Sequence, residues 1–224
     1  MNKDFDWSLI DWTDIGLATL DTLTMLGVSL GFTLALGLPL GVLLFLAGPR
    51  QLLANGKVYA LLSFLVNVLR SLPFVILLIV LIPLTVKLVG TSIGVAGAIP
   101  PLVVGAAPFF ARLVEAALRE VDHGIVEASQ AMGADIWQIV TRALLPEALP
   151  GLLAAATVTA VTLVSYTAMS GVIGGGGLGD LAIRYGYQRF QTEVMAITVL
   201  ALLVLVQLLQ MAGDWLVRRI AHRR

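Results

Sequence analysis

Long uncharged runs of apolar residues are the feature of this sequence that most limits its fold. Four stretches of 20 residues or more contain no Asp, Glu, Lys or Arg: 22–49, 88–111, 148–179 and 194–213. A fifth stretch, 58–86, is interrupted only by Arg70. A helix needs about 20 apolar residues to cross the hydrocarbon core of a membrane. The sequence therefore predicts five transmembrane segments.

The composition agrees with a membrane protein and excludes an ordinary soluble enzyme. Charged residues make up only 12% of the 224 residues, whereas soluble domains carry about 25%. The runs are too long and continuous for barrel strands, which alternate apolar and polar residues. Helices also satisfy their own backbone hydrogen bonds in lipid. We therefore expect an all-α integral membrane protein that forms one domain over residues 1–224.

The basic residues predict how this domain is oriented. Five spans place the termini on opposite sides, and cytoplasmic loops are enriched in Lys and Arg. The side of the C-terminus would hold nine basic residues: Arg50, Lys57, Arg112, Arg119, Arg142, Arg218, Arg219, Arg223 and Arg224. The other side would hold four, namely Lys3, Lys87, Arg184 and Arg189. This difference predicts an outer N-terminus and a cytoplasmic C-terminus, whose basic end would contact anionic lipid rather than nucleic acid.

The N-terminal residues do not read as a secretory signal. The first 21 residues hold one Lys and five Asp, whereas a signal begins with positive charge. We interpret 1–15 as a polar extension at the outer membrane surface.

The stretch 112–147 is the longest polar connection, and it lies between the third and fourth predicted spans. Its apolar residues follow two helical faces, which predicts a helix-turn-helix. Gly133 falls where a left-handed turn residue is needed, and Asp135 is placed to cap the second helix. Such a projecting pair is either a docking element or an interfacial pair on the lipid surface. Interfacial helices favour basic residues, but this stretch has three Arg against six acidic residues, which favours docking.

Glycine and proline recur within the predicted spans. The pairs Gly27/Gly31, Gly37/Gly41 and Gly90/Gly94 have the small-xxx-small spacing that allows close helix contact, although glycine is also simply common in membrane helices. We expect the helices to bend or break at six prolines: Pro39, Pro73, Pro83, Pro100, Pro101 and Pro108. Arg70 either anchors its segment at the inner interface or is paired within the bundle.

The sequence GVIGGGGLG at 171–179 contains a formal G-x-G-x-x-G pattern at Gly174, Gly176 and Gly179. Neither a preceding strand nor a P-loop lysine accompanies it, so nucleotide binding is excluded. We interpret it as an outer gate that is either flexible or tightly turned and in which backbones approach closely. The neighbouring Tyr166, Met169 and Ser170 fit a translocation path or gate, with ordinary helix packing as the alternative.

Residues for catalysis or metal binding do not form a recognisable pattern. The two histidines, His123 and His222, stand near charged interfacial segments, and no H-E-x-x-H motif, nucleophile elbow or cysteine is present. We therefore expect neither catalytic, metal nor cofactor-binding residues in this chain.

The predicted loop also carries a family resemblance. Glu127, Ala128 and Ser129, then Gly133, then Leu145 and Pro146 have the spacing of the "EAA" loop of ABC-importer permeases. Ser129 replaces the third-position alanine and Ala143 replaces an isoleucine. Further stretches resemble the methionine-uptake branch of that family: 67–74, 89–94, 105–109, 127–134, 144–152 and 166–186.

The resemblance implies a bacterial inner-membrane permease for methionine, both D and L, that works by alternating access. It implies a second copy of the chain, two cytoplasmic ATPase subunits that bind ATP and Mg²⁺, and an extracytoplasmic methionine-binding protein. Coupling to the ATPase would involve the loop residues just named together with Met132, Asp135 and Trp137. On this view the chain is a transport subunit and the ATPase is a separate polypeptide.

Three alternatives remain open from the sequence. The substrate would be another small amino acid or a dipeptide if the binding protein selects one. A stand-alone secondary carrier would need ionisable residues inside the spans, where only Arg70 stands. A purely structural membrane protein would leave the docking loop and the glycine stretch unexplained.

Overall fold

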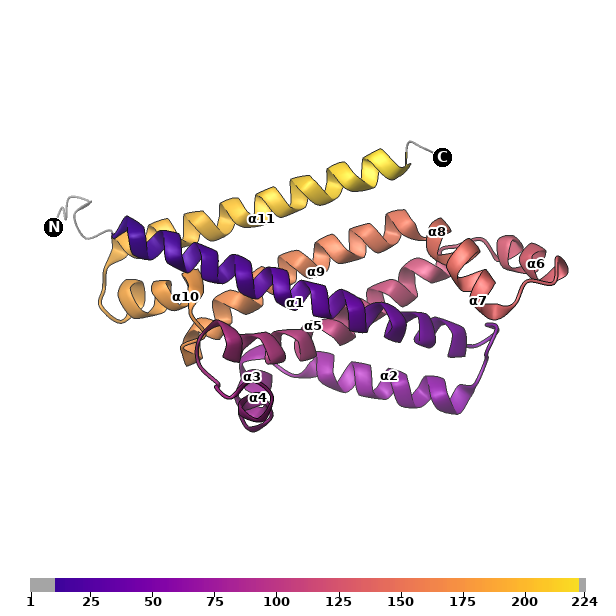
Figure 1. Ribbon diagram of the computed structural model, residues 1–224, viewed down its shortest axis with the longest axis horizontal. Helices are drawn as coiled ribbons and strands as arrows, with labels where there is room; N and C mark the ends of the chain where they lie inside the picture. The colour runs from indigo at the N-terminus through magenta and orange to yellow at the C-terminus, as the bar shows by residue number, and fades with distance from the viewer. Residues whose placement is uncertain (1–10, 222–224) are drawn as a thin grey trace. The chain divides into compact units, whose positions relative to one another are not determined.

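The computed structural model describes residues 11–221, and this part of the chain is helical with no strand. Four long helices form most of it: α1 (Trp12–Ala47), α5 (Gly94–Arg119), α9 (Leu149–Ser170) and α11 (Thr192–Ala221) (Figure 1). Shorter helices join them: α2 (Gly56–Ser71), α3 (Phe74–Val80), α4 (Ile82–Val89), α6 (His123–Ala131), α7 (Ile136–Gln138), η2 (Ile139–Leu144), α8 (Leu145–Glu147), η3 (Gly171–Ile173), α10 (Gly177–Leu181) and η4 (Ala182–Tyr187). The all-helical prediction is confirmed for the described residues.

Four helices within residues 11–221 are long and apolar enough to cross a membrane: Trp12–Ala47, Gly94–Arg119, Leu149–Ile173 and Thr192–Ile220. The second predicted span is divided. Its helices α2 and α3 are separated at Leu72 and Pro73 by a bend of 103°, so they form either a broken fifth span or a re-entrant loop. Pro73 has no backbone N–H to donate, which explains why the helix ends before it.

The other prolines have weaker effects than the sequence predicts. Helix α1 continues through Pro39, and α5 continues through Pro100, Pro101 and Pro108. Pro83 stands in the first turn of α4, where a missing N–H costs nothing. Of the bend or break expected at each proline, a break is excluded at Pro39 and at the three prolines of α5.

Helix boundaries also differ from the predicted spans. Helix α1 begins at Trp12, so Asp14 and Asp21 lie within the helix, and the described end of the predicted extension 1–15 is helical. Residues 1–10 of that extension, together with His222, Arg223 and Arg224, lie outside the described residues. Helix α5 includes residues 112–119, which the sequence assigned to the polar connection. This connection therefore begins eight residues later than predicted.

The chain divides into two compact units that share the long helices. Unit 1 comprises Met1–Phe32, Leu72–Gly105 and Ala160–Gln210, and unit 2 comprises Thr33–Ser71, Ala106–Thr159 and Met211–Arg224. A small core in unit 1 joins Ala18 of α1 to Leu178 and Leu181 of α10 and Val194 of α11.

The larger core belongs to unit 2. It consists of Phe45, Leu46, Phe110, Val114, Leu118, Val126, Ile139, Val140, Leu144, Ala148 and Ala155. Helices α1 and α5 approach closely here, because a Cβ on Gly37 would lie 2.8 Å from Phe110 and one on Gly41 would lie 2.5 Å from Val114. The small-xxx-small prediction is therefore confirmed for this pair. At Gly27/Gly31 and Gly90/Gly94 a Cβ would meet nothing of this chain within 4 Å, so no close contact within the chain uses these two pairs.

Candidate functional site

The first candidate site is the helix pair of unit 2 formed by α6, α7 and η2 (Figure 1). Asp122 caps α6 by accepting the Gly124 N–H at 2.6 Å. The chain then reverses at Gly133, whose φ of +78° is left-handed as predicted. Asp135 caps the next helix in a reciprocal capping box with Gln138, accepting its N–H at 2.8 Å. Local turn and cap chemistry thus fixes both ends of the turn.

The helix pair has a buried side and an exposed side. Val126, Ile139, Val140 and Leu144 lie in the large core of unit 2 together with Leu118 of α5. On the other side, Met132 is 82% exposed and Trp137 is 74% exposed. A tryptophan exposed to this degree on an anchored helix is typical of a surface that contacts another protein.

The remaining residues of the predicted coupling surface fall into two groups. Glu127, Ala128 and Pro146 are exposed. Ser129 and Leu145 act within the chain, because the Ser129 hydroxyl donates to the Ile125 carbonyl at 2.7 Å and Leu145 packs against the large core. The Ser129 carbonyl also accepts the Ala134 N–H, which closes the turn around Gly133.

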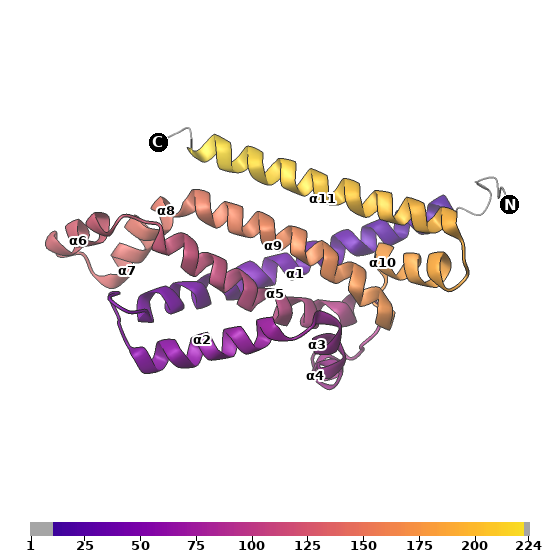
Figure 2. The same cartoon turned by 180° about the vertical axis from the view of Figure 1, so that it is seen from behind.

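The second candidate site is the glycine-rich turn in unit 1, where the chain reverses from α9 into α10 (Figure 2). Gly174, Gly176 and Gly177 have φ between +76° and +81°, a region that glycine adopts without strain. The Gly175 N–H donates to the Ser170 carbonyl, and the Gly94 N–H donates to the Gly174 carbonyl. The sequence left open whether this stretch is flexible or tightly turned, and the tight turn is confirmed.

Two further glycines are needed because backbones touch. A Cβ on Gly179 would overlap the Ala168 backbone, and one on Gly171 would overlap the backbone of Gly179 and Asp180. The α9 end and α10 therefore pack backbone against backbone. The turn is also fixed to α1, because the buried Thr22 hydroxyl accepts the Leu178 N–H at 2.9 Å.

The predicted path residues near the turn have different environments. The Tyr166 ring stacks on Phe74 with centroids 4.2 Å apart and planes 4° from parallel. Ser170 is buried and donates its hydroxyl to the Thr167 carbonyl at 2.7 Å, with the Met25 sulfur 3.8 Å away. Met169 is 43% exposed. The three side chains thus have different contacts: a ring stack for Tyr166, buried hydrogen bonding for Ser170 and an exposed surface for Met169.

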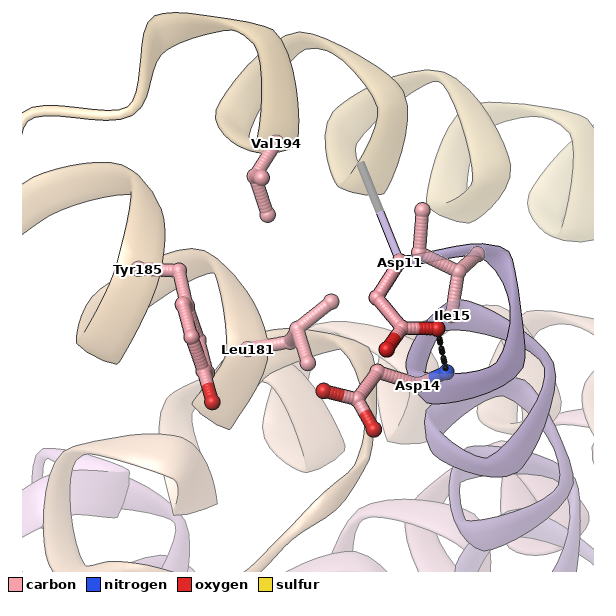
Figure 3. A pocket seen from close by; sticks show the side chains of 6 residues that line it. All are labelled: Asp11, Asp14, Ile15, Leu181, Tyr185 and Val194. Carbon is pink, nitrogen blue, oxygen red and sulfur yellow. Dashed lines mark hydrogen bonds between the residues drawn. The ribbon is translucent and has the colours of Figure 1, made fainter. Parts of the chain in front are cut away.

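A polar cavity beside the turn is a feature that the sequence reasoning missed. It has a volume of about 230 Å³ and is lined by Asp14, Leu17, Ala18, Asp21, Gly176, Gly177, Asp180, Leu181, Arg184 and Tyr185. The buried Asp180 pairs with Arg184 at 2.5 Å. In a neighbouring pocket, Figure 3 shows Asp14 and Tyr185 facing the space between α1 and η4. The charged residues around this cavity were not predicted, because the interpretation of the stretch relied on the formal glycine motif at 174–179.

A buried ion-pair network in unit 2 was also missed. Glu115 of α5 is 3% exposed and contacts Arg112 at 2.5 Å and Arg119 at 2.7 Å. The signal was present in the sequence, since the spacings i−3 and i+4 place both arginines beside Glu115 on a helix. These ion pairs were not predicted because residues 112–119 were interpreted as part of a loop. Arg70, by contrast, is exposed at the end of α2, with its guanidinium 5.8 Å from the Phe109 ring centre.

Within residues 11–221, no three His, Asp or Glu side chains are grouped so that they could hold a metal ion. The described sites are an exposed helix-pair surface, a tight turn and a polar cavity.

A multi-pass helical membrane protein with a projecting helix pair is the class that these features define. The sequence of residues 15–224 matches the family described as "binding-protein-dependent transport system inner membrane component". The chain belongs to this family and is thus an inner-membrane component of an importer rather than its catalytic subunit.

Individual relatives cover nearly the whole chain. The probable D-methionine transport system permease protein MetI of Vibrio cholerae is 52% identical over 222 residues, which are 99% of each chain. The D-methionine transport system permease protein MetI of Escherichia coli K12 is 57% identical over 67% of this chain and 70% of its own. A solved structure of the MetNI methionine ABC transporter in an inward-facing conformation matches with a TM-score of 0.91 and 51% identity, covering 93% of this chain and 96% of that one.

Proposed function

We propose that this chain is the permease subunit of an ATP-driven importer that carries methionine, in its D and L forms, across the bacterial inner membrane. The observation that carries the proposal is the full-length identity of 52% to a relative named as a probable D-methionine permease. The fold match to a methionine transporter supports it. No substrate-specific group in the described spans identifies methionine independently.

The proposed topology has five spans with an outer N-terminus and a cytoplasmic C-terminus. Four spans are the long helices, and α2 with α3 is the fifth, broken at Pro73. The excess of basic residues on one side supports this orientation. The helix pair between α5 and α9 then lies in the cytoplasm.

The helix pair is the proposed coupling element within 112–147. Its exposed side offers Met132 and Trp137 as apolar contacts and Glu127 as a polar contact for a partner ATPase. Asp135 and Gly133 shape the turn, while Ala128, Ser129, Leu145 and Pro146 complete the helical frame. Because the other side is buried in the unit 2 core, force applied to the exposed side would reach the membrane helices without being dissipated.

The glycine-rich turn is the proposed outer gate. Its backbone-to-backbone contacts at Gly171 and Gly179 and its hydrogen bond to Thr22 support a segment that moves as one rigid piece. Gly174 and Gly176 supply the left-handed turn, and Tyr166, Met169 and Ser170 border it along α9.

The proposed assembly contains two copies of this chain, two cytoplasmic ATPase subunits and an extracytoplasmic methionine-binding protein. ATP and Mg²⁺ would be bound by the ATPase subunits. Anionic lipid would contact the basic C-terminal end, where Arg219 lies over Trp215 at 5.0 Å.

The test is ATP-driven uptake of labelled methionine by the purified complex in proteoliposomes with the binding protein present. We expect uptake that requires ATP and is competed by unlabelled L- and D-methionine. Competition by another amino acid or a dipeptide, with methionine inactive, would reassign the substrate. Uptake without any ATPase subunit would instead establish a stand-alone carrier.

Two substitutions test the coupling element within the same complex. Gly133→Val forces a β-branched residue into a left-handed conformation, and Glu127→Lys reverses an exposed charge. We expect both to abolish uptake and the stimulation of ATP hydrolysis by loaded binding protein. Asp214→Lys, an equal charge change at an exposed position of α11, should leave both intact. If both coupling variants keep transport and stimulation, the assignment of this helix pair is wrong.

A further inference from the structure

Helix α2 is weakly held by apolar contacts in unit 2. Val66 is its only buried residue, and the small cluster around it adds Leu44 of α1 and Ala111 of α5. Most of its other apolar side chains are exposed, including Leu61 and Phe64. Tyr59 and Leu62 also pack against this cluster, so apolar contact between α2 and α5 is limited to a few side chains.

A polar network supplies further contacts. The Tyr59 hydroxyl of α2 donates to Glu115 Oε1 at 3.2 Å and accepts a hydrogen bond from Arg119 at 3.3 Å. Arg112 donates to the Asn67 side-chain oxygen of α2 at 3.2 Å and to the Ser63 carbonyl at 3.5 Å. These five side chains, Tyr59, Asn67, Arg112, Glu115 and Arg119, are called the Glu115 clasp below.

The charge arrangement makes Glu115 the centre of the clasp. A buried carboxylate is costly unless it is paired and hydrogen-bonded, and Glu115 has two arginines and one hydroxyl around it. Ionisable groups within membrane helices usually serve a function. Both arginines are on α5 itself, so the pairing of the charges does not require α2. The contacts to Tyr59 and Asn67 are additional and link the two helices.

The clasp is also close in the chain to the helix pair. Arg119 is the last residue of α5, and Asp122 caps α6 three residues later. Leu118 of α5 and Val126 of α6 lie in the same buried core. A displacement of the helix pair is therefore transmitted directly to the segment of α5 that carries the clasp.

We propose that the Glu115 clasp transmits the movement of the helix pair to α2, so that Tyr59 and Asn67 are positioning residues for transport. The inference rests on the proposed function as an ATP-driven importer. Without the clasp, ATP hydrolysis would continue and α5 would move, but α2 would no longer follow it.

The test uses a variant that removes only the contacts of α2. Tyr59→Phe/Asn67→Ala deletes the hydroxyl and the amide but keeps all three charges on α5. In the full complex with ATPase and binding protein, in proteoliposomes, uptake and hydrolysis are measured together. We expect methionine uptake per ATP hydrolysed to fall by at least about fivefold, the lower end of typical coupling between sites. Tyr187→Phe, the same change at a residue that is 71% exposed, should keep the wild-type ratio.

A distance measurement separates transmission from a general loss of structure. The chain has no cysteine, so spin labels at Leu61→Cys on α2 and Ala116→Cys on α5 need no prior substitution. We expect a narrow distance distribution in the wild-type background and a broader one in the double variant. Glu115→Gln keeps an oxygen that can accept from Tyr59 and leaves the Arg112–Asn67 contact in place, so it should broaden the distribution less than the double variant does.

Two outcomes would overturn the inference, and a third would contradict the proposed function instead. An unchanged ratio of uptake to hydrolysis in the double variant would show that the clasp has only a structural role. An unchanged distance distribution would show that other contacts hold α2, which also overturns the proposal. A wild-type complex that hydrolyses ATP without importing methionine would instead contradict the proposed function, and the distance measurement would still decide whether the clasp holds α2.

Discussion

The helix pair at 123–144 and the glycine-rich turn at 171–181 both reverse the chain, but they are built in opposite ways. The helix pair is fixed by side chains: four of its apolar residues lie in the large core of unit 2. The turn is fixed mainly by backbone contacts, at Gly171 and Gly179, and by hydrogen bonds to Ser170 and Thr22. The helix pair exposes Met132 and Trp137, whereas six of the eleven residues of the turn are glycines and its Leu178 and Leu181 are buried.

This difference separates two uses of glycine. A Cβ on Gly133 would meet nothing within 4 Å, so this glycine is required only for its left-handed φ. Gly179 has no positive φ and is required only because the Ala168 backbone occupies the space of a Cβ. The first kind tolerates asparagine, which adopts left-handed conformations more readily than other residues. The second kind tolerates no side chain.

The largest effect is expected for Gly179→Ala. The new methyl group would overlap main-chain atoms of Ala168, which cannot rotate away as a side chain would. Overpacking costs about 1–3 kcal/mol even where side chains can adjust, and we expect at least the upper end here. The check is the yield of monodisperse protein and its melting temperature in detergent. Gly27→Ala, where the space is open, should match the wild type.

A contrasting pair tests the two sides of the helix pair. Leu144→Ala removes a side chain that is 1% exposed and should cost about 2–5 kcal/mol of stability. Trp137→Ala removes a larger side chain that is 74% exposed and should change stability by less than about 0.5 kcal/mol. Thermal unfolding of each variant provides the comparison. Similar losses for both would mean that Trp137 is buried in the isolated chain.

A smaller effect is expected at the contact between the turn and α1. Thr22→Val keeps the side-chain shape but leaves the buried Leu178 N–H without its acceptor. An unsatisfied buried donor costs about 1–3 kcal/mol. Thr22→Ser keeps the hydroxyl and should lose less. Hydrogen exchange at the Leu178 amide would rise in the Val variant, and equal protection in both variants would exclude this bond as a stabilising contact.

The smallest effect is expected for Asp135→Ala. Loss of a helix N-cap costs about 1 kcal/mol, and here it would loosen only the start of α7. The Gln138 N–H donates to the Asp135 side chain, so hydrogen exchange at the Gln138 amide should accelerate. Exchange in the rest of the chain should not change. Protection at Gln138 that survives the substitution would contradict the capping role.

The features predicted correctly from the sequence depend on residues that are close together in the chain. The left-handed turn at Gly133 and the cap at Asp135 follow from local backbone chemistry and were found where expected. The break at Pro73 was also expected from local chemistry, because proline lacks the N–H of a helical hydrogen bond, although α1 continues through Pro39.

The features that the sequence did not predict depend on contacts between residues that are far apart in the chain. Gly27/Gly31 and Gly37/Gly41 have the same spacing, but only the second pair faces another helix, at Phe110 and Val114. The contact between Tyr59 and Glu115 joins residues 56 positions apart, and no local pattern announces it. The glycine run predicted a close backbone approach, but only the structure identifies its partner, the Ala168 backbone beside Gly179.

The most direct test of the coupling proposal is capture of the partner ATPase by affinity-tagged permease in detergent. The wild type is compared with Met132→Ser/Trp137→Ala and with Trp12→Ala, a control that removes a tryptophan 60% exposed at the start of α1. We predict that the wild type and the control retain the ATPase and that the double variant loses it while remaining monodisperse. Undiminished capture by the double variant would contradict the assignment of this exposed surface as the ATPase contact.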